Sequence, residues 1–170
     1  MSRKSGRENR LTGQIGEYLV VAELARRDHL ATTFAGNVPD YDIIATDRRG
    51  RHVSVQVKAS NSESWQFNIL KFCQLTFKGN RQIMGSPHRL RIRGLVVVFV
   101  IISRDPKERD RFFILEWTRL RNIIVSAHRA WLNAHNGIRP RNPKSLHTAI
   151  NVSQILRYEN CWDVISRNLH

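Results

Sequence analysis

The sequence has few cysteines and no long apolar run. Its two cysteines, Cys73 and Cys161, stand far apart and form no CxxC pair. This usage argues against a disulfide framework or a cysteine-rich zinc site. The most apolar stretch, Leu95 to Ile102, is much shorter than the about 20 residues of a membrane-spanning helix. No apolar segment typical of a secretory signal follows the basic N-terminus. These absences predict a soluble intracellular protein of the cytoplasm.

Acidic residues are scarce relative to basic ones. Fourteen Asp and Glu stand against 28 Lys and Arg, which gives a net charge of +14 and a pI of about 11.1. An excess of this size attracts polyanions, although it opposes compaction through self-repulsion. A nucleic acid is therefore the expected partner, and an acidic surface such as a ribosome or a membrane is the alternative.

The length of 170 residues predicts one domain with its own hydrophobic core. Residues 1–10 are expected to form a basic flexible arm, and residues 11–170 to fold together. Within them we expect a core over about 11–120 and a helical C-terminal extension over about 121–170. Strands are expected at 30–34, 41–46, 52–59, 65–69, 95–102 and 111–115, and helices at 11–28 and 117–135. Strands flanked by helices indicate an α/β or α+β fold.

The stretch PDYDIIATDRRGRHVSVQVKAS, residues 39–60, predicts a hairpin. Its turn signal is Asp47-Arg48-Arg49-Gly50. Side chains alternate between the two faces of a strand. Alternation in 53–58 therefore places the three valines on one face and Ser54, Gln56 and Lys58 on the other.

The simplest register of this hairpin brings a carboxylate to its polar face. If the turn is centred on Arg49 without a bulge, Asp42 lies opposite Gln56 and Asp40 lies opposite Lys58. A carboxylate, an amide and an ammonium then converge on one patch. Such a patch is either a functional site or an ordinary solvated hairpin face with a surface ion pair.

Glu17 is a carboxylate on an apolar stripe of the first predicted helix. Its neighbours three, four and seven positions ahead are Val20, Val21 and Leu24. Burying a carboxylate there is costly unless it is paired or binds a cation. Glu23, by contrast, has Arg27 four positions ahead, which predicts an ordinary exposed pair. Glu17 is thus a candidate site residue, or else a half-exposed glutamate at the edge of the stripe or one paired with a distant arginine.

Together these features resemble the PD-(D/E)XK nuclease superfamily. The residues that carry the resemblance are Gly13, Gly16 and Glu17 on a helix, Asp42 before two isoleucines, and Gln56 and Lys58 on the next strand. The spacing is nearest to Holliday-junction resolvase-like and homing-type members. The resemblance covers about residues 11–60, plus the general order of elements to about 120. It implies a restriction-endonuclease-like core, with a mixed central sheet, flanking helices and extra C-terminal helices.

The resemblance also implies an activity, namely metal-dependent hydrolysis of DNA phosphodiester bonds by an endonuclease. Asp42, Gln56 and Glu17 would hold Mg²⁺, with Mn²⁺ as a substitute, and Lys58 would orient the attacking water or stabilise the transition state. Asp40 is the alternative acid or an outer partner. Since cutting both strands requires two such sites, a homodimer or larger assembly is expected.

The departure from the superfamily pattern is Gln56, which stands at the D/E position. Its amide oxygen can ligate a hard cation but brings no charge. This predicts weak Mg²⁺ binding, and it leaves open a catalytically inactive nucleic-acid-binding module with the same fold. A third alternative is an RNA- or ribosome-associated basic protein with a coincidental motif.

A basic flank between 71 and 93 has no assignable secondary structure in the sequence. We expect its exposed cations to contact DNA phosphates and the nearby aromatic residues to belong to the core. The expected DNA-binding residues are Lys78, Arg81, Arg89, Arg91 and Arg93. The Pro-stiffened stretch 135–147 is a second basic segment, which we interpret as a connector.

Overall fold

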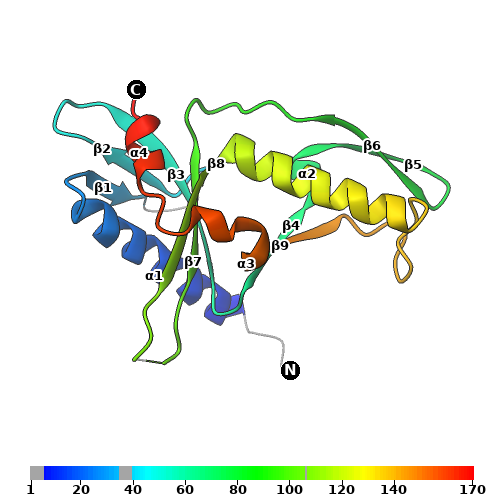
Figure 1. Ribbon diagram of the computed structural model, residues 1–170, viewed down its shortest axis with the longest axis horizontal. Coiled ribbons are helices and arrows are strands. Elements are labelled where there is room, and N and C mark those ends of the chain that lie inside the picture. Colours follow the sequence, from blue (N-terminus) through cyan, green and yellow to red (C-terminus); the bar gives the residue numbers. More distant parts are fainter. Residues whose placement is uncertain (1–5, 35–39, 106) are drawn as a thin grey trace.

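The computed structural model describes residues 6–34, 40–105 and 107–170, and its largest feature is a five-stranded sheet (Figure 1). The strands lie in the order β1-β2-β3-β7-β8. Their bounds are β1 Leu30–Thr33, β2 Ile43–Thr46, β3 His52–Ser60, β7 Val96–Ile101 and β8 Arg111–Glu116. β3 and β7 are parallel and the other neighbours are antiparallel, so the sheet is mixed. The expected α/β fold with a mixed central sheet is confirmed.

β7 is an interior strand of the sheet, and its sequence suits burial on both faces. Five consecutive residues, Val96 to Val100, are fully buried. Alternate side chains enter two separate apolar clusters, one containing Val98 and the other containing Phe99. A continuous run of valine and phenylalanine is typical of a strand covered on both sides. The sheet therefore has one apolar cluster on each of its two faces, and the elements that cover these faces surround the candidate site.

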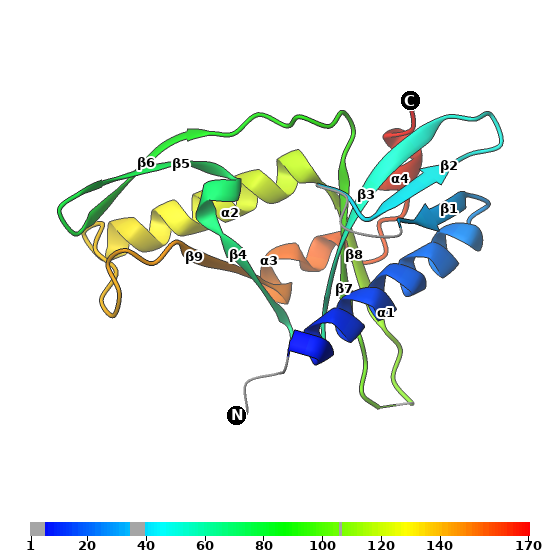
Figure 2. The ribbon, with the colours of Figure 1, turned by 180° about the vertical axis from the view of Figure 1, so that it is seen from behind.

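Helix α1 (Gly6–Ala25) covers the first face of the sheet (Figure 2). Its buried residues Val20 and Leu24 pack with the valines of β3. The helix approaches β3 closely at Gly16, where an added Cβ would lie 2.4 Å from the Cβ of Ala59. Only glycine fits at that distance, so Gly16 sets the height of the helix above the strand. Short helix α4 (Asp163–Arg167) contributes to the same apolar cluster.

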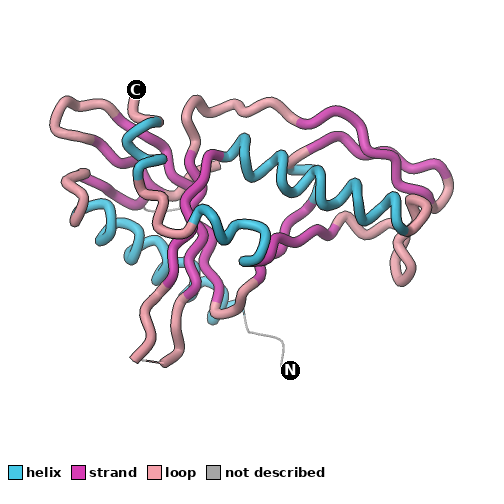
Figure 3. The backbone as a smooth tube through the Cα atoms, in the orientation of Figure 1, coloured by secondary structure: helices cyan, strands magenta, loops and turns pink. Residues whose placement is uncertain are grey.

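The second face carries the long helix α2 (Trp117–Ala134) and two small antiparallel sheets (Figures 1 and 3). One pairs β4 (Ser64–Asn68) with β9 (His147–Asn151), and the other pairs β5 (Cys73–Lys78) with β6 (Arg81–Pro87). The remaining elements are α3 (Val152–Ile155) and the 3₁₀ helices η1 (Ile69–Lys71) and η2 (Leu156–Tyr158). α2 buries an amphipathic stripe that includes Leu120, Ile124 and Leu132.

The start of the first helix differs from the sequence expectation. This helix begins at Gly6, so the arm predicted for 1–10 is helical from Gly6 onward, and residues 1–5 lie outside the described residues. Thr12 lies inside the helix, where its hydroxyl donates to the carbonyl of Glu8 at 2.9 Å. α1 is also covered on one side only, since Leu11, Ile15 and Tyr18 are exposed.

The C-terminal segment after residue 120 contains helices, as expected, and also one strand that the sequence analysis does not predict. His147–Asn151 is a strand, because alternate residues Thr148 and Ile150 are buried against its partner β4. The last helix, moreover, packs in the same cluster as α1. The segment after 120 is thus built into both layers of the main fold.

Candidate functional site

The β2–β3 hairpin has the register expected from its turn. Ile43 pairs with Val55, and Thr46 pairs with His52. The turn is stabilised by Asp47, whose Oδ1 accepts hydrogen bonds from the backbone N–H groups at 49 and 51. Gly50 completes the turn with a φ of +76°. No bulge interrupts the ladder from Ile43 to Thr46, so the predicted register is confirmed over these residues, whereas Asp42 precedes the ladder and does not pair with Gln56 in it.

The two faces of β3 have different surroundings. Val53, Val55 and Val57 are buried in the cluster beneath α1. Gln56 and Lys58 are half-buried and line one pocket on the opposite face. The alternation predicted from the sequence therefore holds, with Gln56 and Lys58 on the same face.

Asp42 is held against the edge of β3 just before β2 begins. Its backbone N–H donates to the carbonyl of Val55 at 2.9 Å. Its Oδ2 accepts a hydrogen bond from the backbone N–H of Val57 at 2.7 Å. The carboxylate therefore accepts the hydrogen bond of the Val57 N–H in place of a backbone carbonyl from β2. This bond fixes the position of the carboxylate relative to β3.

Gln56 fixes the same segment from the other direction. Its Nε2 donates to the backbone carbonyl of Asp40 at 3.1 Å. With Nε2 used in this way, Oε1 remains the acceptor of the side chain. Asp40 has a φ of +79°, and the ladder ends before it, so Asp40 does not pair across from Lys58 as predicted. Asp40 does line the same pocket as Gln56 and Lys58.

Glu17 reaches this region from α1, where it is half-buried. Burial raises the pKa of Glu17, the negative charge of Asp42 raises it further, and the positive charge of Lys58 opposes both effects. Glu17, Asp42 and Lys58 thus lie close enough to influence one another, although they come from three separate elements. The proximity extends to Glu17, Asp42 and Lys58, and their role as a site stays a prediction.

Lys58 has the most mixed electrostatic surroundings of this group. Burial lowers the pKa of Lys58, and the neighbouring charge of Lys71 lowers it too, while Asp42 and Glu17 favour the charged form. Lys71 was not among the residues predicted for the site. It lies in the short 3₁₀ helix η1, and no periodicity in the sequence places it beside β3.

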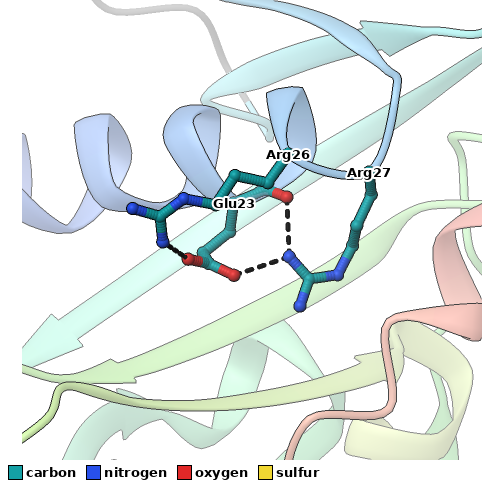
Figure 4. Close-up of polar contacts among 3 residues, drawn as sticks. All are labelled: Glu23, Arg26 and Arg27. Atoms are coloured by element: carbon teal, nitrogen blue, oxygen red, sulfur yellow. Dashed lines mark hydrogen bonds and ion pairs between the residues drawn. The ribbon is translucent and has the colours of Figure 1, made fainter.

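Glu23, farther along α1, provides the contrasting case (Figure 4). Its carboxylate forms ion pairs with both Arg26 and Arg27. Burial raises the pKa of Glu23, but hydrogen bonds and charge from the two arginines outweigh it, so that the pKa is lowered overall. The expected pair with Arg27 is confirmed, and Glu23 is neutralised within its own helix.

The donors available to a metal ion are limited. Across residues 6–34, 40–105 and 107–170, no group of three or more His, Cys, Asp or Glu side chains is placed to hold one. What this region offers is the carboxylates of Glu17 and Asp42 and, on the pocket face of β3, the amide of Gln56. Oxygen donors of this kind suit a hard divalent cation.

The expected DNA-binding residues fall into separate places, and all are exposed. Arg89 and Arg91 line the same pocket as Lys58. Lys78 and Arg81 are paired at the tip of the β5–β6 hairpin and line a different pocket beneath α2. Arg93 lies in the loop before β7. The nearby aromatics are mostly core residues, since Trp65 and Phe72 are buried, whereas Phe67 is half-buried and Phe77 is exposed.

The basic stretch 135–147 is a connector, as interpreted from the sequence. The buried Gln82 holds it in place by donating from Nε2 to the carbonyls of Pro143 and Ser145, at 2.8 and 2.9 Å. Lys144 donates to the carbonyl of Gly79. These contacts tie the stretch to the β5–β6 hairpin.

Comparison with known proteins finds similarity at the level of the fold. No family model and no curated protein sequence matches the chain. A bacterial homing endonuclease, I-Ssp6803I, matches with a TM-score of 0.53 and 14% identity, over 93% of each chain. Hjc, a Holliday junction resolvase from the archaeal hyperthermophile Archaeoglobus fulgidus, matches with a TM-score of 0.46 and 16% identity, over 91% of this chain and 95% of that one. The chain therefore shares the fold of a nuclease. Within the described residues, no helix combines the length and apolarity needed to cross a membrane.

Proposed function

We propose that the protein is a metal-dependent DNA endonuclease of the PD-(D/E)XK type, in the variant form that carries glutamine before the lysine. The observation that best supports this is the fixed carboxylate of Asp42, held 2.7 Å from the Val57 N–H at the edge of β3. Lys58 follows on the same strand, and Glu17 approaches from α1. This arrangement of charges is compatible with metal-assisted hydrolysis of a phosphodiester.

The donor chemistry fits a divalent cation. Glu17, whose pKa is raised by burial and by the negative charge of Asp42, is a favourable ligand for positive charge together with Asp42. Asp42 uses only one of its oxygens for Val57, so the other is available, and Gln56 presents its Oε1. Glu17, Asp42 and Gln56 would hold Mg²⁺, or Mn²⁺ in its place. When bound, such an ion lowers the pKa of water and neutralises charge on the phosphate.

Lys58 has its own role in this proposal. Its ammonium group carries three donors and lies next to two carboxylates that favour its charged form. It would hold the attacking water or a phosphate oxygen in position and stabilise the negative charge that develops on that oxygen. The rigid strand beneath it makes this placement reproducible, since Val57 and the preceding valines are anchored in the core.

The substrate and assembly follow from charge and from the number of sites. A net charge of +14, with exposed arginines beside Lys58, favours a polyanion such as DNA. Because one site cuts one strand, cleavage of both strands would use two copies of the chain. The glutamine at 56 favours one alternative, a DNA-binding module that has the fold and no catalysis.

The decisive experiment is cleavage of plasmid and branched DNA with Mg²⁺ or Mn²⁺. Lys58→Ala should lower the rate by about 10²–10³-fold, the usual effect of losing one transition-state donor. Lys107→Ala, an exposed lysine in the loop after β7, is the matched control and should cut normally. If the wild type cuts no substrate while still binding DNA, the inactive module is the correct function.

A further inference from the structure

We infer that the pocket beside Lys58 binds an unpaired nucleotide, so that the preferred substrate is DNA with a splayed or single-stranded segment. The inference takes from the proposed function that the ligand is DNA. It adds which part of the DNA enters the protein and which residues receive it.

The pocket has the size and form of a ligand site. Its volume is about 580 Å³, within the range of about 300–1,000 Å³ usual for small-molecule pockets. It lies between the polar face of β3, the 3₁₀ helix η1, the loop 88–92 and the first residue of α2. A single nucleotide can enter such a space, whereas a base-paired helix can only lie across its mouth.

One wall of the pocket is apolar and partly aromatic. Trp117 stacks on Phe72 with ring centroids 6.0 Å apart and an interplanar angle of 24°. Phe67 packs edge-on against the same Phe72 ring. Leu70, at 41% exposure, is an exposed apolar residue among the lining residues. Faces of this kind bind nucleobases by stacking and without sequence preference.

The pocket is also lined by cationic residues. These are Lys58, Lys71, Arg89 and Arg91, and among the described residues Asp40 is the only acidic one that lines it. Lys58 and Lys71 are close enough for the charge of one to lower the pKa of the other. Cationic side chains together with apolar and aromatic ones match the two parts of a nucleotide, the phosphate and the base.

The rim of the pocket is held in place before any ligand binds. The backbone N–H of His88 donates to the carbonyl of Phe72 at 2.8 Å, and its ring Nε2 lies 3.0 Å from the carbonyl of Leu70. Arg121 donates to the carbonyl of His88 at 2.8 Å. The loop that carries Arg89 and Arg91 is therefore anchored to both η1 and α2, which lowers the entropy cost of binding.

A second hollow continues the path beyond Lys58. Its volume is about 530 Å³, and it shares Lys58, Phe67 and Lys71 with the first pocket. Together the two hollows form a groove that passes the candidate catalytic lysine. A single strand could follow this groove with one phosphate at Lys58 and the adjacent base in the aromatic pocket.

Duplex DNA does not explain the apolar wall. In a duplex, base faces are covered by their stacked neighbours, so a protein reaches phosphates and base edges only. Contacts of that kind need exposed cations and no aromatic pocket. A base that is already unstacked has a free face, and the pocket offers rings to cover it.

The inference is tested by binding in EDTA, with a forked DNA, a blunt duplex of the same sequence and an oligothymidylate. We expect the fork to bind about tenfold tighter than the duplex. Leu70→Gln should reduce this preference several-fold, since it makes the apolar wall polar without changing charge. Leu156→Gln, at an exposed leucine that lines none of the pockets described above, is the matched control and should leave the preference intact. Equal affinity for fork and duplex overturns the inference.

A second readout locates the base directly. Thymidine trinucleotide should quench the tryptophan fluorescence of the wild type and of Trp131→Phe, but not of Trp117→Phe. Trp131 is a suitable control because it is 36% exposed and stacks on His135 instead. Quenching that survives Trp117→Phe places the base elsewhere and contradicts the inference.

These outcomes are separate from those of the cleavage assay. A protein that cuts duplex DNA without preferring forks keeps the proposed function and loses the nucleotide pocket. A protein that prefers forks through Leu70 and Trp117 but cuts nothing keeps the pocket and loses the endonuclease.

Discussion

The middle of α1 and its last turn each carry a glutamate, and the two carboxylates have opposite surroundings. In the last turn, Glu23 forms ion pairs with Arg26 and Arg27, and its pKa is lowered (Figure 4). In the middle of the helix, Glu17 is half-buried beside the like charge of Asp42, and its pKa is raised. Of these two glutamates on one helix, one is thus paired with arginines, and the other lies near a second negative charge.

This difference separates a structural carboxylate from a candidate functional one. Glu23 is neutralised by arginines three and four positions ahead, the spacing at which helix side chains meet. Glu17 has valines at those positions, and its charged neighbours belong to other parts of the chain. A half-buried carboxylate that its own helix does not neutralise destabilises the fold unless a cation or a substrate stabilises its charged form. Such a residue is therefore a candidate for a functional site.

The largest expected effect is on activity. Glu17→Gln should lower the cleavage rate at least about 100-fold, because it removes one of two carboxylates from a site with few ligands. Glu23→Gln, the same change on the same helix, should cut DNA at the wild-type rate. The measurement is the rate of plasmid nicking at saturating Mn²⁺, with circular dichroism to show that both variants are folded. Equal losses in the two variants would remove the functional distinction between the glutamates.

The next effect concerns the contact that positions Glu17. Gly16→Ala places a Cβ 2.4 Å from the Cβ of Ala59, so α1 must move away from β3. We expect a loss of about 1–3 kcal/mol in the free energy of unfolding and a lower cleavage rate, since Glu17 moves with the helix. Urea denaturation measures the first and plasmid nicking the second.

Gly13→Ala is the control for this contact. No atom lies within 4 Å of a Cβ at that position, outside the helix's own backbone and the adjacent residues. The substitution should raise stability by about 0.5–1 kcal/mol, the usual gain of alanine over glycine within a helix. A stabilising Gly16→Ala would show that the close approach of α1 to β3 has no energetic importance.

The sequence predicts the local geometry of the site well, because that geometry depends on short-range rules. Strand alternation places Gln56 and Lys58 on one face, and the turn ending in Gly50 fixes the register with β2. The apolar stripe around Glu17 correctly marks it as a carboxylate without a partner on its helix. Each of these inferences uses neighbours only a few residues away.

Long-range features were harder to predict. The pairing of β9 with β4 joins segments that are far apart in sequence, and each strand is too short to be recognised alone. Lys71 reaches the site from a 3₁₀ helix, which leaves no periodic signal. The β5–β6 hairpin did have a signal, since Gly79-Asn80 is a typical two-residue turn. The many surrounding cations concealed its strand pattern.

A smaller effect is expected on the metal requirement, and it tests whether Gln56 belongs to the same site as Glu17. Gln56→Glu adds a third carboxylate near Glu17 and Asp42, and it should lower the Mg²⁺ concentration for half-maximal cleavage by about tenfold. The change also removes the hydrogen bond donated to the carbonyl of Asp40. Gln74→Glu, at an exposed position of β5 that lines none of the pockets described above, adds the same charge and should leave the metal requirement unchanged. An unchanged requirement in Gln56→Glu would mean that this side chain does not face the metal.

The smallest effect is the pH dependence of stability, measured in EDTA by urea denaturation. Glu23 has a folded pKa below the ordinary value of 4.5, so its ion pairs stabilise the protein above pH 4.5 and are lost as the pH falls through the lowered pKa. Glu23→Gln should therefore cost about 0.5–1 kcal/mol at pH 7. Glu17 has a raised pKa, so its charged form lowers the free energy of unfolding above that pKa, and this loss disappears below pH 4.5. Glu17→Gln should accordingly stabilise the protein at pH 7 by a similar or smaller amount, and the two variants should converge on the wild type in acid. With Mg²⁺ added, Glu17→Gln should destabilise the protein instead of stabilising it, because the wild-type carboxylate then binds the ion. Glu23→Gln should show no such reversal.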